Sequence, residues 1–205
     1  MFYSIESSPY MKTLLGPTPF EHSTLATTMR DKLAKPILSS GDIHHGDIAP
    51  VIALGKTGNP CIFPMVWGVS IPNTPKVVPM MSLTTAERLF PESVETHRCL
   101  AVSSFYYERR EADGKLFAVQ PSGKDFCLMG AIYIVVDGFP HFVVLTRQPS
   151  DSIKGLTEKS MPVIFSEASA EKWLDPSEKA FRVARRASER MVYVRTEGLG
   201  PRTYA

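Results

Sequence analysis

Two pairs of β-rich runs in the middle of the chain, each joined at an Asp-Gly step, constrain the fold more than any other feature. The four runs cover residues 97–110, 115–121, 126–136 and 139–149. Asp113-Gly114 lies between the first two runs, and Asp137-Gly138 lies between the last two. Asp-Gly between strand-forming segments is a strong hairpin signal, because both residues tolerate the backbone angles of a tight turn. The sequence therefore predicts a substantial antiparallel sheet.

The remaining segments favour short strands and short helices around that sheet. Further β-rich runs cover residues 49–54, 61–71, 76–81, 161–165 and 192–196. Helical patterns cover residues 20–34, 84–90, 166–174 and 177–191. The first helix is expected to have Ser23 as its cap and to end before Pro36. We predict a single α+β domain over residues 1–205, with a curved, mainly antiparallel, barrel-like sheet flanked by a few helices.

The composition excludes several classes of protein. Apolar residues make up 43% of the chain and charged residues 21%, which is ordinary globular usage and not that of a disordered chain. The net charge of only +2 makes no case for nucleic acid unless basic residues cluster locally. No apolar stretch approaches the ~20 residues of a membrane helix, and the first residues lack the pattern of a signal peptide. We therefore expect a soluble, cytoplasmic protein with no membrane partner.

Cysteine and histidine positions do not predict a metal site. The three cysteines lack zinc-ligand spacing and are expected to be reduced, mostly buried thiols: Cys61, Cys99 and Cys127. His44-His45 and Asp47 lie together on a loop, but no further ligand follows at a recognised spacing, so a solvated turn is favoured. His141 alternates within an apolar run and is expected to be a hydrogen-bonded strand residue.

Gly55-Lys56-Thr57 superficially resembles part of a phosphate-binding loop. The complete motif needs a glycine five residues before Gly55, and that position holds Pro50. No helical segment follows Thr57, so no helix N-terminus is available to hold a phosphate. The segment is predicted to be an exposed hairpin tip, and no cofactor is expected.

Between residues 46 and 174, a series of short motifs occurs in a fixed order. The motifs are Gly46–Ile52, Val66–Pro72, His97–Leu100, Phe105–Glu108, Leu128–Ala131, Val144–Thr146, Met161–Val163 and Trp173-Leu174. In this order they resemble the SOS response-associated peptidase (SRAP) family, whose members sense abasic sites in single-stranded DNA. The resemblance implies a curved sheet with a DNA-binding cleft. Residues 177–205, a basic helix and tail, lie beyond the region of strongest resemblance.

The resemblance also implies covalent chemistry at the second residue. In the family this residue is a cysteine, whose amine and thiol close a thiazolidine on the ring-opened sugar of an abasic site, helped by an asparagine, a glutamate and a histidine. Here Phe2 stands at the cysteine position, Glu108 at the glutamate position and Glu158 at the histidine position. The asparagine position falls at Ser82 or Leu83. The crosslinking and autopeptidase site is therefore expected to be degenerate. Whether a lyase reaction of a free α-amine survives, with Glu108 moving protons, stays open.

The candidate DNA contacts are one tryptophan and five arginines: Trp67, Arg109, Arg110, Arg182, Arg185 and Arg186. Trp67 either stacks on a base or fills the core, since both roles need a flat ring. The last three arginines share one face of the helix expected over 177–191, where they either contact phosphates or form a solvated, salt-bridged surface. Glu108 either lines the cleft or pairs with an arginine at a strand end.

Two functions follow from these observations. The first is a SRAP-like protein associated with single-stranded or abasic-site DNA in the SOS response to DNA damage. The alternative is a catalytically inactive interaction or structural module without DNA activity. Salt-dependent binding of short single strands separates the two, because phosphate contacts weaken as salt concentration rises.

Overall fold

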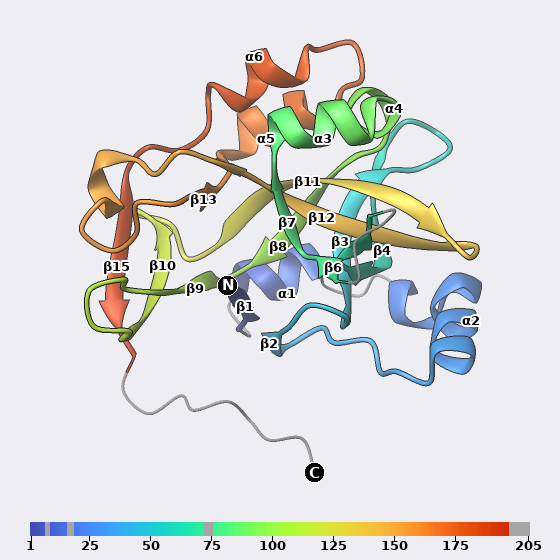
Figure 1. Ribbon diagram of the computed structural model, residues 1–205. Helices are drawn as coiled ribbons and strands as arrows, with labels where there is room; N and C mark the ends of the chain where they lie inside the picture. Colours follow the sequence, from blue (N-terminus) through green and yellow to red (C-terminus); the bar gives the residue numbers. More distant parts are fainter. Residues whose placement is uncertain (7–8, 16–18, 72–75, 197–205) are drawn as a thin grey trace.

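The computed structural model describes residues 1–6, 9–15, 19–71 and 76–196, and its centre is a closed ring of five strands (Figure 1). The ring contains β3 (Ile48–Leu54), β4 (Pro60–Trp67), β8 (Arg98–Ser103), β11 (Cys127–Val136) and β12 (Phe139–Arg147). The pairing runs in the order β12-β4-β3-β8-β11 and returns to β12. Only the β12–β4 pair is parallel; the other four pairs of the ring are antiparallel. The predicted barrel-like, mainly antiparallel sheet is confirmed.

A second sheet of five strands lies beside the barrel, in the order β15-β10-β9-β1-β2. Its strands are β1 (Phe2–Ile5), β2 (Gly41–Ile43), β9 (Phe105–Arg109), β10 (Leu116–Pro121) and β15 (Met191–Arg195). Short strands extend the barrel or form a small separate hairpin: β5 (Val69–Ser70), β6 (Val77–Val78), β7 (Met80–Ser82), β13 (Met161–Pro162) and β14 (Ile164–Phe165).

The chain passes from the barrel to the second sheet at Ser104. Its backbone N–H donates to the Ser4 carbonyl at 2.8 Å, and its Oγ accepts from the Glu6 backbone N–H at 2.8 Å. These two bonds attach β1 to the bend between β8 and β9. The sequence had indicated one continuous run over 97–110, which the structure divides into two strands.

Both Asp-Gly steps form turns between antiparallel strands. Asp137 and Gly138 have φ angles of 51° and 81°, as expected for a two-residue turn with both central residues at positive φ. At the other hairpin, Gly114 has a φ of 69°, and the Arg110 N–H donates to the Lys115 carbonyl at 2.8 Å. The predicted hairpins β11–β12 and β9–β10 are therefore confirmed.

Trp67 belongs to the core. It is 0% exposed, its Nε1–H donates to the Pro79 carbonyl at 2.9 Å, and its ring contacts those of Tyr3 and Phe142. A ring enclosed in this way offers no free face to a base. The assignment of Trp67 as a DNA contact is therefore wrong, and the core alternative holds.

Helices cover parts of the barrel. They are α1 (Pro9–Leu15), α2 (Thr24–Leu33), α3 (Leu83–Leu89), α4 (Pro91–Thr96), α5 (Glu167–Leu174) and α6 (Ala180–Ala184), with 3₁₀ turns η1 (Pro19–His22) and η2 (Asp151–Ile153). In Figure 1, α3 to α6 lie together above the barrel, while α2 lies at its lower right. The predicted cap of α2 is confirmed, since Ser23 Oγ accepts from the Ala26 N–H at 3.1 Å.

The tryptophan of α5 joins this helix to the barrel. Trp173 is fully buried, and its Nε1–H donates to the Cys99 carbonyl at 2.9 Å. Arg98, only 4% exposed, lies over the same ring and donates to the carbonyls of Asp175 and Glu178. Two motifs of the resemblance, around Arg98 and Trp173, therefore have a structural role.

The basic helix expected over 177–191 does not form as one element. The helix α6 covers only Ala180–Ala184, because the chain then turns to bond with the barrel. The Ser188 N–H donates to the Ile164 carbonyl at 2.7 Å, while Ala187 is buried beneath it. The shared helical face of Arg182, Arg185 and Arg186 is therefore a wrong prediction.

Candidate functional site

A cavity of about 390 Å³ lies where the start of β1, the end of β9 and the loop before β13 meet. We call it the N-terminal cavity. Its walls are Met1, Met80, Glu108, Arg109, Arg110, Glu111, Gly114, Thr157, Lys159 and Ser160. The β1–β9 pairing, with Phe2 opposite Tyr107, brings the chain start next to Glu108. Residues separated by more than a hundred positions thus meet in one cavity.

Glu108 is the half-buried carboxyl group of this cavity. Burial raises the pKa of its carboxyl above the ordinary glutamate value, while the charge of the N-terminal ammonium and, less strongly, that of Lys159 act in the opposite direction. A partly desolvated carboxyl in a cavity is suited to accept or donate protons during a reaction. Of the two open interpretations of Glu108, the cavity position is the one observed, and no ion pair to an arginine is found among the described residues.

Phe2 fills the position of the family's cysteine with an aromatic ring. The ring is stacked on Tyr107 at a centroid distance of 4.3 Å and on His44 at 4.8 Å. All three cysteines are free thiols; Cys99 and Cys127 are buried in barrel strands and Cys61 is exposed, in agreement with the expectation of reduced, mostly buried thiols. The described walls of the N-terminal cavity contain no thiol.

Glu158, at the family's histidine position, does not line the N-terminal cavity. Its side chain is exposed, and its backbone N–H donates to Glu111 Oε1 at 3.3 Å. The neighbouring residues Thr157 and Lys159 form the wall instead, and Lys159 Nζ lies 3.8 Å from Glu111 Oε1. Lys159 is a site residue that the sequence analysis missed, and the only signal for it was its place beside Glu158.

A second, larger cavity of about 590 Å³ adjoins the first. We call it the arginine cavity. Its walls are Ser82, Leu83, Thr84, Thr146, Arg147, Gln148, Pro149, Lys159, Ser160, Val163, Phe181, Ala184, Arg185 and Glu189. The two cavities share Lys159 and Ser160 in their walls, so they adjoin, and we call the two together the groove. Ser82 and Leu83, at the family's asparagine position, also lie here.

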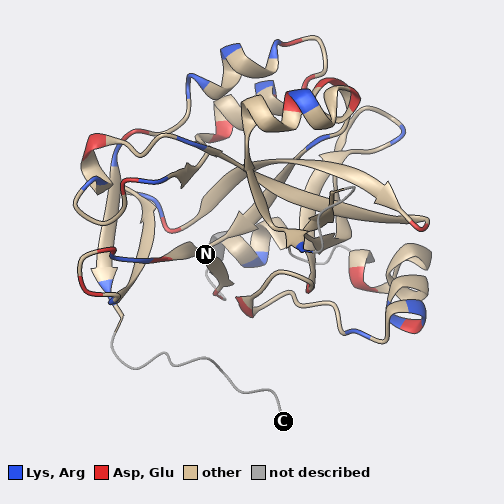
Figure 2. Cartoon of the chain, in the orientation of Figure 1, with Lys and Arg blue, Asp and Glu red and all other residues tan. Residues whose placement is uncertain are grey.

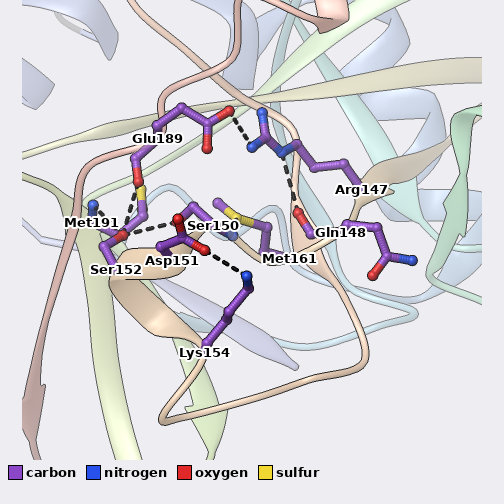
Figure 3. A network of polar contacts seen from close by, with 9 residues as sticks. All are labelled: Arg147, Gln148, Ser150, Asp151, Ser152, Lys154, Met161, Glu189 and Met191. Atoms are coloured by element: carbon purple, nitrogen blue, oxygen red, sulfur yellow. Dashed lines mark hydrogen bonds and ion pairs between the residues drawn. The ribbon is translucent and has the colours of Figure 1, made fainter.

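The arginine cavity has an excess of positive charge. Three cationic side chains and one carboxylate line it: Arg147, Lys159, Arg185 and Glu189. Arg147 Nη2 lies 2.5 Å from Glu189 Oε1, as Figure 3 shows. Along the described chain, Lys and Arg are interspersed with Asp and Glu (Figure 2).

The arginines proposed as DNA contacts separate into different environments. Arg109 lines the N-terminal cavity and donates to the Gly114 carbonyl at 3.1 Å. Arg110 also lines it, but its guanidinium is paired with Asp113 at 2.5 Å and lies over the Phe117 ring.

The arginines around α6 also differ from one another. Arg185 lines the arginine cavity, whereas Arg182 and Arg186 are exposed and lie outside the walls of both cavities of the groove. Of these three arginines, Arg185 is therefore the one that lines the groove.

The histidine loop forms a turn, in which the His44 N–H donates to Asp47 Oδ2 at 2.8 Å. Within the described ranges, no three His, Cys, Asp or Glu side chains gather as metal ligands would.

No helix in the described ranges has the length and apolar character needed to cross a membrane.

These features define an α+β barrel domain with a cationic groove beside the start of its first strand. The model of the SOS response associated peptidase (SRAP) family matches residues 23–196. The chain therefore belongs to this family, as its ordered motifs predicted.

Solved structures share the fold at low sequence identity. A protein from Bacteroides thetaiotaomicron has a TM-score of 0.70 and 16% identity, with 97% of this chain and 93% of that chain covered. A phage-related protein from Bordetella bronchiseptica has a TM-score of 0.69 and 14% identity, with coverages of 96% and 94%. A further Bordetella bronchiseptica protein has a TM-score of 0.68 and 14% identity, with coverages of 96% and 99%. Comparison with curated proteins yields no match.

Proposed function

We propose that this chain binds single-stranded DNA in the groove, as a SRAP protein of the SOS response whose covalent site is degenerate. The observation that carries the proposal is that the two cavities adjoin at Lys159 and Ser160. The half-buried carboxyl of Glu108 therefore lies next to a cavity with more cationic than anionic side chains. Membership of the SRAP family also supports binding to DNA.

The cations of the groove supply the binding energy in this proposal. Lys159, Arg185 and Arg109 are candidate phosphate contacts, because their side chains line the groove and ionic contacts to phosphate provide most sequence-independent affinity. The near-neutral net charge of +2 is compatible with this, since a few nucleotides need only a local strip of positive charge.

The chemistry proposed for the N-terminal cavity is limited by Phe2. Thiazolidine formation needs an amine and a thiol on adjacent carbons, and Phe2 has no thiol, so we expect no thiazolidine crosslink to an abasic site. Glu108 keeps the proton-transfer position. An abasic sugar held here would meet a carboxyl group, but not the nucleophile that the family uses.

Fluorescence anisotropy with a labelled eight-nucleotide single strand tests the binding. Three phosphate contacts on a single strand give a log–log salt slope of about −2, so affinity should fall about 16-fold between 50 and 200 mM salt. Lys159→Ala should weaken binding and reduce this slope by about 0.7. Lys56→Ala is the control, because Lys56 is exposed at the β3–β4 turn, outside the groove.

Absence of binding at 50 mM salt would contradict the proposal and favour the alternative, an interaction or structural module without DNA activity. A denaturation-resistant adduct with an abasic oligonucleotide would contradict the degenerate covalent site. An adduct that appears only after borohydride reduction would instead identify the lyase reaction of an amine.

A further inference from the structure

We propose that Glu111 is the positioning residue of the groove: it holds the segment 156–159 at the end of β9 and thereby fixes Lys159 where the two cavities adjoin. The proposal rests on the proposed function, because Lys159 is one of the candidate phosphate contacts. It deepens that function by naming the residue on which this contact depends. Glu111 itself is not assigned a contact with DNA.

Glu111 contacts four consecutive residues of this segment. Its backbone N–H donates to the Leu156 carbonyl at 3.3 Å. Its side-chain oxygen Oε1 accepts from Thr157 Oγ1 at 3.3 Å and from the Glu158 N–H at 3.3 Å, and it lies 3.8 Å from Lys159 Nζ. The backbone and the side chain of Glu111 therefore both attach the segment to the end of β9.

The hydroxyl of Thr157 links Glu111 to the backbone of Lys159. Thr157 is 3% exposed, and a hydroxyl in such a place needs a hydrogen-bond partner. Its Oγ1 donates to Glu111 Oε1 and accepts from the Lys159 N–H at 3.4 Å. The Glu158 N–H makes no other hydrogen bond to a described residue. Both residues that follow Thr157 are therefore bonded to the Glu111 carboxylate, either directly or through one hydroxyl.

The ion pair between Lys159 and Glu111 contributes less to this attachment than the hydrogen bonds. The two side chains are 82% and 40% exposed, and exposed ion pairs are weakened by water and salt. The hydrogen bonds involve a buried hydroxyl and a backbone N–H, and their loss would leave these groups without a partner. The positioning is therefore assigned to the acceptor oxygen of Glu111 and not to its charge.

The position of this segment matters because its neighbouring residues carry opposite charges. Lys159 lines both cavities, whereas Glu158 lines neither. A segment free to turn would present a carboxylate to the phosphates in some of its conformations. A lysine that becomes ordered only on binding also loses conformational freedom, which weakens the complex. Removal of the Glu111 side chain should therefore remove the contribution of Lys159 to DNA binding.

The effect of Lys159→Ala in different Glu111 backgrounds tests the proposal. Anisotropy at 50 mM salt measures binding of the labelled eight-nucleotide strand, and each comparison stays within one background, so the lost charge of Glu111 cancels. With Glu111 present, Lys159→Ala should weaken binding about threefold to tenfold. The effect should persist in Glu111→Gln, whose amide oxygen still accepts both bonds, and fall below about twofold in Glu111→Ala. Glu95→Ala is the control background and should leave the effect intact, because Glu95 is exposed on α4, outside the groove.

Hydrogen exchange tests the positioning without DNA. In Glu111→Ala, the amides of Glu158 and Lys159 should exchange at least about fivefold faster than in the wild-type chain, because their acceptors are lost or released. In Glu111→Gln they should exchange at nearly the wild-type rate. Mass spectrometry of peptic fragments that cover residues 156–159 measures the rates.

The outcomes separate the two proposals. If Lys159→Ala has its full effect in Glu111→Ala, or if exchange there is unchanged, the positioning role is overturned while binding to single-stranded DNA stands. If Glu111→Gln behaves like Glu111→Ala, the charge of Glu111 acts and its hydrogen bonds do not, which would also overturn the proposal. If the wild-type chain does not bind the strand, the proposed function falls, and the exchange rates alone decide whether Glu111 holds the segment.

Discussion

At the scale of single residues, Gly68 shows how one position sets the path of the chain beside the core tryptophan. It follows Trp67 at the end of β4, has a φ of +111° and donates its N–H to the Phe142 carbonyl at 2.7 Å. A Cβ placed on Gly68 would lie 2.4 Å from Val77 Cγ1. The position therefore needs glycine for its backbone angle and for the close approach of β6.

Replacing this glycine should be costly. Gly68→Ala is expected to lower the free energy of unfolding by about 2–4 kcal/mol, from the disfavoured backbone angle and the crowding of Val77. Gly123→Ala is the matched control: its φ is +74° and no atom lies within 4 Å of the added Cβ, so only about 1–2 kcal/mol should be lost. Urea denaturation at equilibrium measures both, and equal losses would show that crowding does not matter.

The sequence placed one of the two candidate glutamates in the cavity correctly and the other incorrectly. Glu108 was identified from its place in an ordered motif, and it does line the N-terminal cavity. Glu158 was assigned by counting along the chain, but the cavity wall includes the neighbouring Lys159 and not Glu158. Two adjacent residues commonly point in different directions, so a one-residue error in alignment exchanges a residue of the cavity wall for one outside it.

At the scale of elements, the segment after α5 shows how tertiary bonds override a local pattern. Its sequence has helical spacing over 177–191, yet α6 ends at Ala184. The barrel captures the next residues through the Ser188–Ile164 bond. As a result, Arg185 reaches the groove while Arg182 does not.

This difference predicts unequal effects of two similar substitutions. Arg185→Ala should weaken binding of an eight-nucleotide single strand about threefold to tenfold at 50 mM salt and reduce the log–log salt slope by about 0.7. Arg182→Ala, which removes an equal charge from α6 three residues earlier, should leave both quantities nearly unchanged. Anisotropy titrations at several salt concentrations measure them. Equal effects would mean that the whole arginine cluster contacts DNA.

At the scale of the whole molecule, the two sheets differ in how their edges are satisfied. Each strand of the barrel ring has a neighbour on both sides, because the ring closes through β12. In the second sheet, β15 and β2 each have a single neighbour among the described strands, and Val194 of β15 is 70% exposed. Backbone amides in these edge strands are therefore protected from solvent by fewer contacts.

Hydrogen exchange should report this difference. Amides of β3, β8 and β11 are expected to exchange at least tenfold more slowly, after correction for intrinsic rates, than those of β15 and β2, because their opening disrupts the closed ring. Mass spectrometry of peptic fragments under native conditions measures the rates. Equal protection of β15 and β8 would indicate that both sheets open together.

Features that depend on residues close along the chain could be predicted correctly without the structure. Asp137-Gly138 specified a tight turn, and Ser23 specified the start of α2, because each acts on its own backbone or on that of a near neighbour. The order of the motifs identified the family, which the match over residues 23–196 confirms.

Features that depend on contacts between distant residues became visible once the folded chain was known. The parallel pairing of His141 with Val66 closes the barrel, the pairing of Phe2 with Tyr107 brings β1 beside Glu108, and the Arg147–Glu189 contact joins β12 to the segment before β15. No local pattern encodes these contacts, because each results from the packing of the whole core. The groove exists for the same reason: its walls come from segments that meet only when the barrel and the second sheet are assembled.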